Sequence, residues 1–149
     1  MATHRFTGRL AWKKGESGVS MGNHRVEFEG RPTLEVSAAP QYRGDPSKLN
    51  PEELFLASLA SCQMLTYLAL ASRAGVELIA YEDQPEATLA IAERKMRVTE
   101  VVLRPRITIA GGDEAKARSL VDSAHDGCFI ANSVACPVRA EPEIVTASP

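Results

Sequence analysis

The most prominent hydrophobic feature of the chain is an uncharged stretch over residues 54–72. Asn50, Pro51 and two glutamates precede it. This is typical of a helix start, because asparagine caps, proline tolerates the first turn and acidic residues suit the positive end of the helix dipole. Gly75 offers a C-terminal stop. The pattern therefore predicts a helix over residues 51–73.

This predicted helix is apolar on nearly every side. Its length would just span a bilayer, but polar side chains interrupt the run and no basic flank sets an orientation. A helix that is apolar all round is a buried central helix. A chain of 149 residues seldom encloses a helix of about six turns on every side. We therefore expect a second subunit to cover part of it.

The remaining hydrophobic pattern is typical of short strands. Before the long helix, three segments separated by turn residues predict an antiparallel meander; they are residues 6–13, 25–29 and 33–37. After the helix, segments rich in Val, Ile, Leu and Thr predict a second sheet. They are residues 76–81, 88–92 and 98–109, with a hairpin turn at residues 93–95.

A second helix and a last extended segment complete the pattern. Apolar positions at helical spacing predict a helix over residues 113–124, which Gly127 ends. Residues 133–145 then predict the last strand. The order βββ-α-βββ-α-β indicates the α+β class, as a single domain over residues 1–149 in which two antiparallel sheets pack around long helices.

Composition and charge narrow the function classes. The chain is 44% hydrophobic and 24% charged, which is ordinary for a soluble globular domain. The formal net charge is −2 and there is no basic run, which argues against nucleic acid as a partner. No signal peptide precedes the first strand, so we expect a cytoplasmic protein whose three cysteines start as thiols. Since no C-x-x-C pair is present, we expect no structural metal.

Two of the cysteines carry the candidate chemistry. Cys62 lies in the sequence Ala-Ser-Cys-Gln-Met, in the middle of the predicted long helix. Cys128 directly follows Gly127, at the end of the predicted second helix. Taken alone, each is most simply a small buried hydrophobic residue, because free cysteine is among the most buried residue types.

Taken together, the sequences around these cysteines resemble the OsmC/Ohr family of thiol-dependent peroxidases, in its OsmC-like branch. The first motif, residues 50–62, reads Asn-Pro-Glu-Glu-Leu-Phe and then Ala-Ser-Leu-Ala-Ser-Cys. The second, residues 125–134, reads His-x-x-Cys-Phe-Ile-Ala-Asn-Ser-Val. Arg-Gly-Asp at residues 43–45 and Leu-Arg-Pro-Arg at residues 103–106 extend the resemblance over nearly the whole chain. It implies an intertwined OsmC-like homodimer, with central helices between the sheets, that reduces organic hydroperoxides.

The resemblance also implies a role for each cysteine. Cys62 matches the family's peroxidatic cysteine and Cys128 its resolving cysteine. In such chemistry a thiolate attacks the terminal oxygen of a hydroperoxide, an alcohol leaves, and the sulfenic acid condenses with the second thiol to an intrasubunit disulfide. The mechanism requires no cofactor. It requires an organic hydroperoxide and an external thiol reductant as partners, and neither nucleic acid nor a membrane.

An ionised Cys62 requires a stabilising group, because burial raises the pKa of a thiol. The family uses an arginine held by a glutamate, and Glu52 matches the glutamate. Asn23 stands where this branch often has an arginine. Arg25, two places later, is therefore the first candidate for the arginine, and Arg43 is the second.

Glu52 and Cys62 are ten positions apart, which is about 15 Å along a continuous helix. They cannot share a compact site within one straight helix. If both serve one site, either the helix breaks or the glutamate comes from the partner chain.

Two other interpretations remain open. A cysteine hydrolase would pair Cys62 with His125 and orient the imidazole with Asp122 or Asp126. A non-catalytic OsmC-like dimer would instead bind an apolar small molecule in a pocket lined by large apolar side chains. Candidates for that lining are Trp12, Phe55, Met64 and Phe129. Cys136 has no role in the resemblance, and we expect it to be a strand residue.

Overall fold

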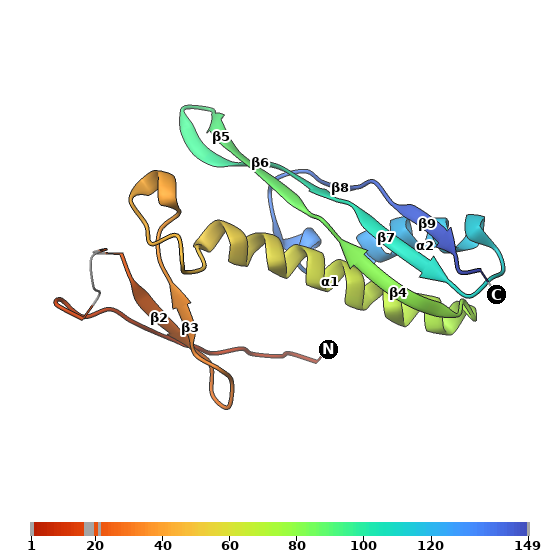
Figure 1. Ribbon diagram of the computed structural model, residues 1–149, viewed down its shortest axis with the longest axis horizontal. Coiled ribbons are helices and arrows are strands. Elements are labelled where there is room, and N and C mark those ends of the chain that lie inside the picture. The colour runs from red at the N-terminus through yellow and green to blue at the C-terminus, as the bar shows by residue number, and fades with distance from the viewer. Residues whose placement is uncertain (1, 17–19, 21, 149) are drawn as a thin grey trace. The chain divides into compact units, whose positions relative to one another are not determined.

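The computed structural model describes residues 2–16, 20 and 22–148. The chain divides into two compact units, residues 1–55 and residues 56–149. The division falls in the first turns of helix α1 (Pro51–Ala74). Figure 1 shows the elements of each unit by their labels.

The first unit is a small antiparallel sheet. Its strands β1 (Arg9–Ala11), β2 (His24–Glu27) and β3 (Leu34–Val36) pair in sequence order, and a short 3-10 helix, η1 (Pro40–Tyr42), follows. Val26 stands opposite Leu10 on one side and Leu34 on the other. The predicted three-stranded meander is therefore confirmed.

The ends of α1 follow the local sequence signals. The backbone N–H of Glu53 donates to Oδ1 of Asn50 at 2.9 Å, and the Glu53 carboxylate accepts from the Asn50 N–H at 3.0 Å, so the two residues form a reciprocal capping box. At the other end Gly75 adopts a φ of 71°, where a side chain would be strained. The N–H of Val76 then reaches the Ala71 carbonyl at 2.9 Å, which ends the helix.

Four strands, not the predicted three, connect the two helices. They are β4 (Leu78–Asp83), β5 (Glu86–Ala92), β6 (Lys95–Leu103) and β7 (Pro105–Ile109). The single strand predicted over residues 98–109 is therefore wrong. The strand ends at Arg104, whose N–H donates to the Asp83 side-chain carboxylate at 2.7 Å and not to a backbone carbonyl, and Pro105 has no N–H to donate. The predicted hairpin turn is confirmed, because Glu93 and Arg94 both have positive φ angles.

The C-terminal segment also differs from the prediction. It contains two strands, β8 (Val138–Ala140) and β9 (Glu143–Thr146), rather than one over residues 133–145. Both pair in parallel, β8 with β6 and β9 with β7. The second unit thus holds two mixed sheets, in the orders β4-β7-β9 and β5-β6-β8. The α+β class is confirmed, whereas the prediction of two antiparallel sheets is corrected, for the described residues, to three sheets of three strands.

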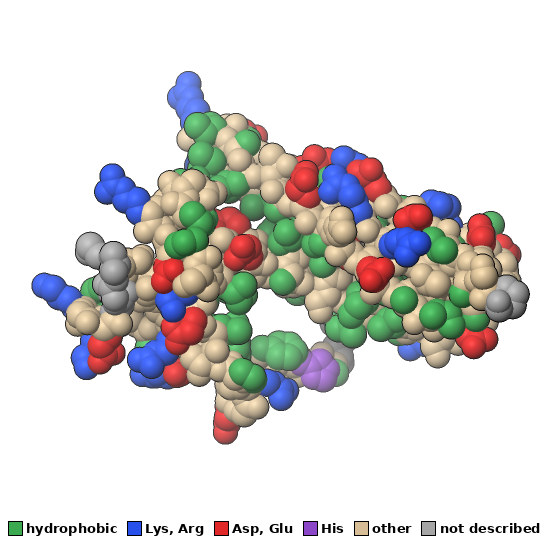
Figure 2. All heavy atoms as spheres, in the orientation of Figure 1, with side chains coloured by type: hydrophobic (Ala, Val, Ile, Leu, Met, Phe, Trp, Pro, Cys, Tyr) green, Lys and Arg blue, Asp and Glu red, His purple; other side chains and the backbone are tan. Residues whose placement is uncertain are grey.

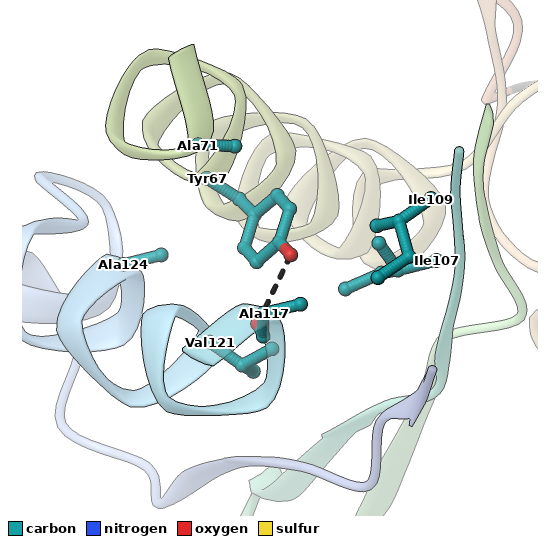
Figure 3. Close-up of a cluster of buried hydrophobic side chains, with 7 residues drawn as sticks. All are labelled: Tyr67, Ala71, Ile107, Ile109, Ala117, Val121 and Ala124. Atoms are coloured by element: carbon teal, nitrogen blue, oxygen red, sulfur yellow. Dashed lines mark hydrogen bonds between the residues drawn. The ribbon is translucent and has the colours of Figure 1, made fainter. Parts of the chain in front are cut away.

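The core of the second unit joins three elements. Helix α2 (Glu114–Gly127), capped by Asp113, packs with α1 on the same side of β7, as Figure 3 shows. The phenol of Tyr67 points from α1 to α2 and donates to the Ala117 carbonyl at 3.0 Å. The buried cluster consists of Tyr67, Ala71, Ile107, Ile109, Ala117, Val121 and Ala124. This cluster fixes the two helices against one sheet.

Only one face of α1 is buried within the chain. Its buried residues recur every four positions and are Leu59, Gln63, Tyr67 and Ala71. By length and composition α1 could cross a membrane, but this stripe packs as the inner face of a core helix. One chain therefore buries one face of α1, and the expectation that a second subunit covers part of the helix stays a prediction. Leu65, on another face, is 59% exposed, and Figure 2 shows hydrophobic side chains at the surface near the middle of the view, where Figure 1 draws α1.

Candidate functional site

Cys62 lies near the middle of α1 and is half-buried. Its neighbour Gln63 is on the buried face, where its side-chain amide donates to the Val121 carbonyl of α2 at 3.1 Å. Thr66, one turn later, donates its hydroxyl to the Cys62 carbonyl at 2.9 Å. The helix therefore holds Cys62 at the edge of the core, with its sulfur on the α2 side.

Cys128 lies in the loop that follows α2. Its N–H donates to the His125 carbonyl at 3.2 Å, and its side chain is 1% exposed. The loop continues through Phe129 and Ile130 into a short 3-10 helix, η2 (Ala131–Ser133). The Ala131 N–H donates to the Cys128 sulfur at 3.4 Å. The chain thus turns tightly around this sulfur.

The two sulfurs meet between α1 and this loop, and both cysteines are free thiols. Cys128 lies beside Cys62, and its thiol is among the groups that lower the pKa of Cys62. Burial raises the pKa of Cys62, but the nearby Ile130 N–H, Cys128 thiol and Phe129 N–H lower it, and the net pKa is lowered. The arrangement favours a thiolate at Cys62.

Cys128 titrates in the opposite direction. Burial raises its pKa, and the hydrogen bond and negative charge of Cys62 raise it further, against the lowering effect of the Ala131 and Ile130 N–H groups. Tyr81 of β4 is also held protonated, because burial, and then the charge of Asp83, raise its pKa. The site therefore combines one thiol whose pKa is lowered with one whose pKa is raised, which suits attack by Cys62 followed by condensation with Cys128.

The other predicted catalytic residues lie apart from this pair in the sequence. Glu52 is half-buried in the first turn of α1, and its Oε2 is a buried oxygen without a hydrogen-bond partner among the described residues. Arg25 is an exposed residue of β2, with its guanidinium 3.7 Å from the Glu16 carboxylate. It lines a surface pocket of about 670 Å³ in the first unit. Arg43 is exposed in the loop after η1, with a φ of 63°.

The geometry gives the hydrolase interpretation no support. The Nδ1 atom of His125 is buried, and it has no hydrogen-bond partner among the residues that the structure describes. Neither Asp122 nor Asp126 therefore orients the imidazole through Nδ1. Among all the residues that the structure describes, no group of three or more His, Cys, Asp or Glu side chains is arranged to hold a metal ion.

The residues suggested for an apolar pocket have different surroundings. Trp12 lines the 670 Å³ pocket, but its neighbours there are mostly charged or polar and include none of the other three candidates. Phe55 and Met64 are half-buried on α1. Phe129 is 80% exposed, directly after Cys128.

Cys136 was predicted to be a strand residue, but it precedes β8 and lies in a bend.

Sequence reasoning missed the groups that donate to Cys62. Phe129 and Ile130 act through backbone N–H groups, which leave no side-chain signal. Thr66 could have been found, because residues four apart share a helix face. Gly127 marked the helix end at which the loop begins, but the direction of the amides depends on the fold.

Comparison with known proteins places these features in context. A family model described as OsmC-like protein matches residues 44–143. An OsmC-like protein of unknown function from Vibrio cholerae has a similar structure, with a TM-score of 0.87, 30% identity, and coverage of 95% of this chain and 100% of that one. An organic hydroperoxide resistance protein OsmC from Legionella pneumophila has the same fold, with a TM-score of 0.70 at 21% identity over 97% and 99% of the chains. The uncharacterized Bacillus subtilis protein YmaD is 22% identical over 138 residues, or 90% of this chain and 89% of its own.

Proposed function

Because the chain belongs to the OsmC-like family, we propose that it is a thiol-dependent peroxidase that reduces organic hydroperoxides to alcohols in the defence against oxidative stress. The observation that carries this proposal is the pair of neighbouring free thiols, in which the pKa of Cys62 is lowered and that of Cys128 is raised. The same fold in a protein named for organic hydroperoxide resistance supports it.

The proposed reaction oxidises the two cysteines in two steps, and a third step reduces them again. The Cys62 thiolate attacks the terminal oxygen of the hydroperoxide, the O–O bond breaks, and the alkoxide leaves as an alcohol after taking a proton. Cys62 is then a sulfenic acid, oxidised by two electrons. The Cys128 thiol, which already contacts the Cys62 sulfur, attacks that sulfur and expels water, leaving a Cys62–Cys128 disulfide. An external dithiol returns the two electrons by thiol–disulfide exchange.

Apolar surface near the cysteines favours an alkyl substrate. Phe129 is 80% exposed and directly follows Cys128. An alkyl chain gains about 25 cal/mol for each Å² of apolar surface that it buries, and hydrogen peroxide gains none. We therefore propose that alkyl hydroperoxides are preferred over hydrogen peroxide.

A homodimer is part of the proposal. One face of α1 carries exposed or half-buried apolar residues, such as Leu65 and Leu68, that a second subunit would cover. In addition α1 is unbroken from Pro51 to Ala74, so the broken-helix alternative for Glu52 and Cys62 does not apply. Glu52 would then serve the Cys62 of the other subunit, and its unpartnered Oε2 would hold a guanidinium, with Arg25 as first candidate and Arg43 as second.

Hydroperoxide consumption by the purified protein with a dithiol reductant tests the function. We expect turnover of an alkyl hydroperoxide with a kcat/KM above that for hydrogen peroxide. Cys62→Ser should abolish turnover, whereas Cys136→Ser should retain it. Equal or higher efficiency with hydrogen peroxide would refute the substrate preference. Survival of all three thiols in excess alkyl hydroperoxide would refute the peroxidase and favour a non-catalytic dimer that binds an apolar molecule.

A further inference from the structure

Gln63 is a fully buried polar side chain that directly follows Cys62. It is 1% exposed and belongs to the buried stripe of α1. Burying an amide costs free energy that an apolar side chain of the same size would avoid, and the Oε1 atom of Gln63 has no hydrogen-bond partner among the described residues. Packing alone would therefore favour an apolar residue at this position.

The amide nitrogen of Gln63 forms a hydrogen bond between the two helices. It donates to the Val121 carbonyl of α2 at 3.1 Å. Val121 lies inside α2, where each carbonyl accepts from the N–H four residues later, so this carbonyl would have a partner without Gln63. The bond therefore docks α1 on α2 and is not needed to complete either helix.

A second contact holds the same turn of α1 against the end of α2. The hydroxyl of Thr66 donates to the Cys62 carbonyl at 2.9 Å, and its methyl group lies 3.4 Å from the point where a Cβ on Gly127 would stand. Gly127 directly precedes Cys128, so this close approach lies next to the second thiol. The Cys62 turn of α1 is therefore held to α2 at both the Gln63 amide and the Thr66 methyl.

We propose that Gln63 is a positioning residue of the peroxidase site: its amide docks the Cys62 turn of α1 on α2 and thereby sets how closely Cys62 approaches Cys128. The inference rests on the proposed function, in which these two sulfurs form a disulfide. A disulfide allows a narrow range of Cα separations, and a pair held outside that range forms a strained bond that is reduced more easily. The redox equilibrium of the pair therefore reports the docking.

The test is the thiol–disulfide equilibrium of the full chain with glutathione, in a Cys136→Ser background that leaves two cysteines. One glutathione disulfide oxidises the Cys62–Cys128 dithiol and releases two glutathione thiols, and mass spectrometry after alkylation gives the ratio of oxidised to reduced chain. Gln63→Met keeps the length of the side chain and removes the amide. It should lower the equilibrium constant for disulfide formation by roughly three- to tenfold, as expected for one lost hydrogen bond, and Gln63→Leu should do the same.

Tyr67→Phe is the matched control for a general effect on the helix pair. The Tyr67 hydroxyl donates to the Ala117 carbonyl of α2 at 3.0 Å, so this variant also removes one buried hydrogen bond between the same two helices. That bond is one helical turn farther from the cysteines along each helix than the Gln63 bond. Tyr67→Phe should therefore leave the glutathione equilibrium unchanged, although it weakens the contact between the helices.

The outcomes decide the inference without reference to hydroperoxide turnover. An unchanged equilibrium constant in the Gln63 variants would overturn it, and so would an equal loss in Tyr67→Phe. Failure of both Gln63 variants to fold, as seen by circular dichroism, would also overturn it, because the amide would then serve the fold as a whole. A lowered constant in the Gln63 variants alone supports it even if the chain consumes no hydroperoxide, in which case the proposed function fails and the positioning role stands.

Discussion

Cys62 and Cys128 are neighbouring thiols that move each other's pKa values apart, downward for Cys62 and upward for Cys128. Their proximity favours ionisation of Cys62 and opposes ionisation of Cys128. A nucleophile and its resolving partner need this asymmetry, because two neighbouring thiolates would repel each other and a protonated Cys62 would not attack. The roles follow from the difference in surroundings: more donors reach Cys62, whereas Cys128 is more deeply buried.

The first prediction concerns the pH dependence of the two thiols. Because its pKa is lowered, Cys62 should form the reactive thiolate at a lower pH than an ordinary thiol does. Its reactivity should be lost as the pH falls through its own pKa. Cys128, with a raised pKa, should react only at higher pH. Cys128→Ala removes one donor and should lower the alkylation rate of Cys62 at pH 7 by about threefold, as measured by peptide mass spectrometry. Cys136→Ala is the control, and an equal loss in both variants would contradict the role of the contact.

The second prediction concerns assembly. Leu65 is 59% exposed in one chain, so a glutamate at this position stays solvated in an isolated subunit but becomes an unpaired buried charge in the proposed dimer. Leu65→Glu should shift the protein from dimer to monomer in sedimentation velocity at micromolar concentration, with its circular dichroism spectrum retained. Ser123→Glu, at an exposed position of α2, should leave assembly unchanged. A stable wild-type monomer would refute the dimer.

The third prediction concerns the helix pair that supports the site. Tyr67→Phe removes the buried hydrogen bond to the Ala117 carbonyl and keeps the ring. The free energy of unfolding should fall by about 1 kcal/mol in urea at fixed protein concentration. Tyr42→Phe alters a side chain that is 49% exposed and should change stability by less than about 0.5 kcal/mol. Similar losses in both variants would show that the buried bond contributes little.

Local signals explain the parts of the fold that the sequence predicts well. The Asn50 cap, the Gly75 stop and the turn at residues 93–95 each depend on a few neighbouring residues, and the structure has all three. The parallel partners of β8 and β9 were not predicted, because they join segments far apart in the chain, such as Val101 with Val138. Hydrophobic pattern identifies a strand, but it does not identify its partner.

The candidate site also has features that the sequence predicts and features that depend on the fold. The cysteine motifs marked Cys62 and Cys128, although nothing in their spacing placed the two sulfurs together. The family resemblance implied an arginine side chain that stabilises the thiolate, whereas the groups that lower the pKa of Cys62 in the structure include the backbone amides of Ile130 and Phe129. A backbone donor depends on the direction of a peptide group, which only the folded loop sets.

The last prediction is the disulfide itself. One equivalent of an alkyl hydroperoxide should link Cys62 to Cys128 within one subunit and leave Cys136 as a thiol, because the first two thiols are near enough to shift each other's pKa. Peptide mapping identifies the bond, and non-reducing electrophoresis shows that no second chain is attached. Cys128→Ser should allow one oxidation and then expose Cys62 to irreversible sulfinic and sulfonic forms, whereas Cys62→Ser should leave Cys128 unoxidised. A bond between Cys128 and Cys136 would refute the mechanism, since it would leave the Cys62 sulfenic acid without its partner.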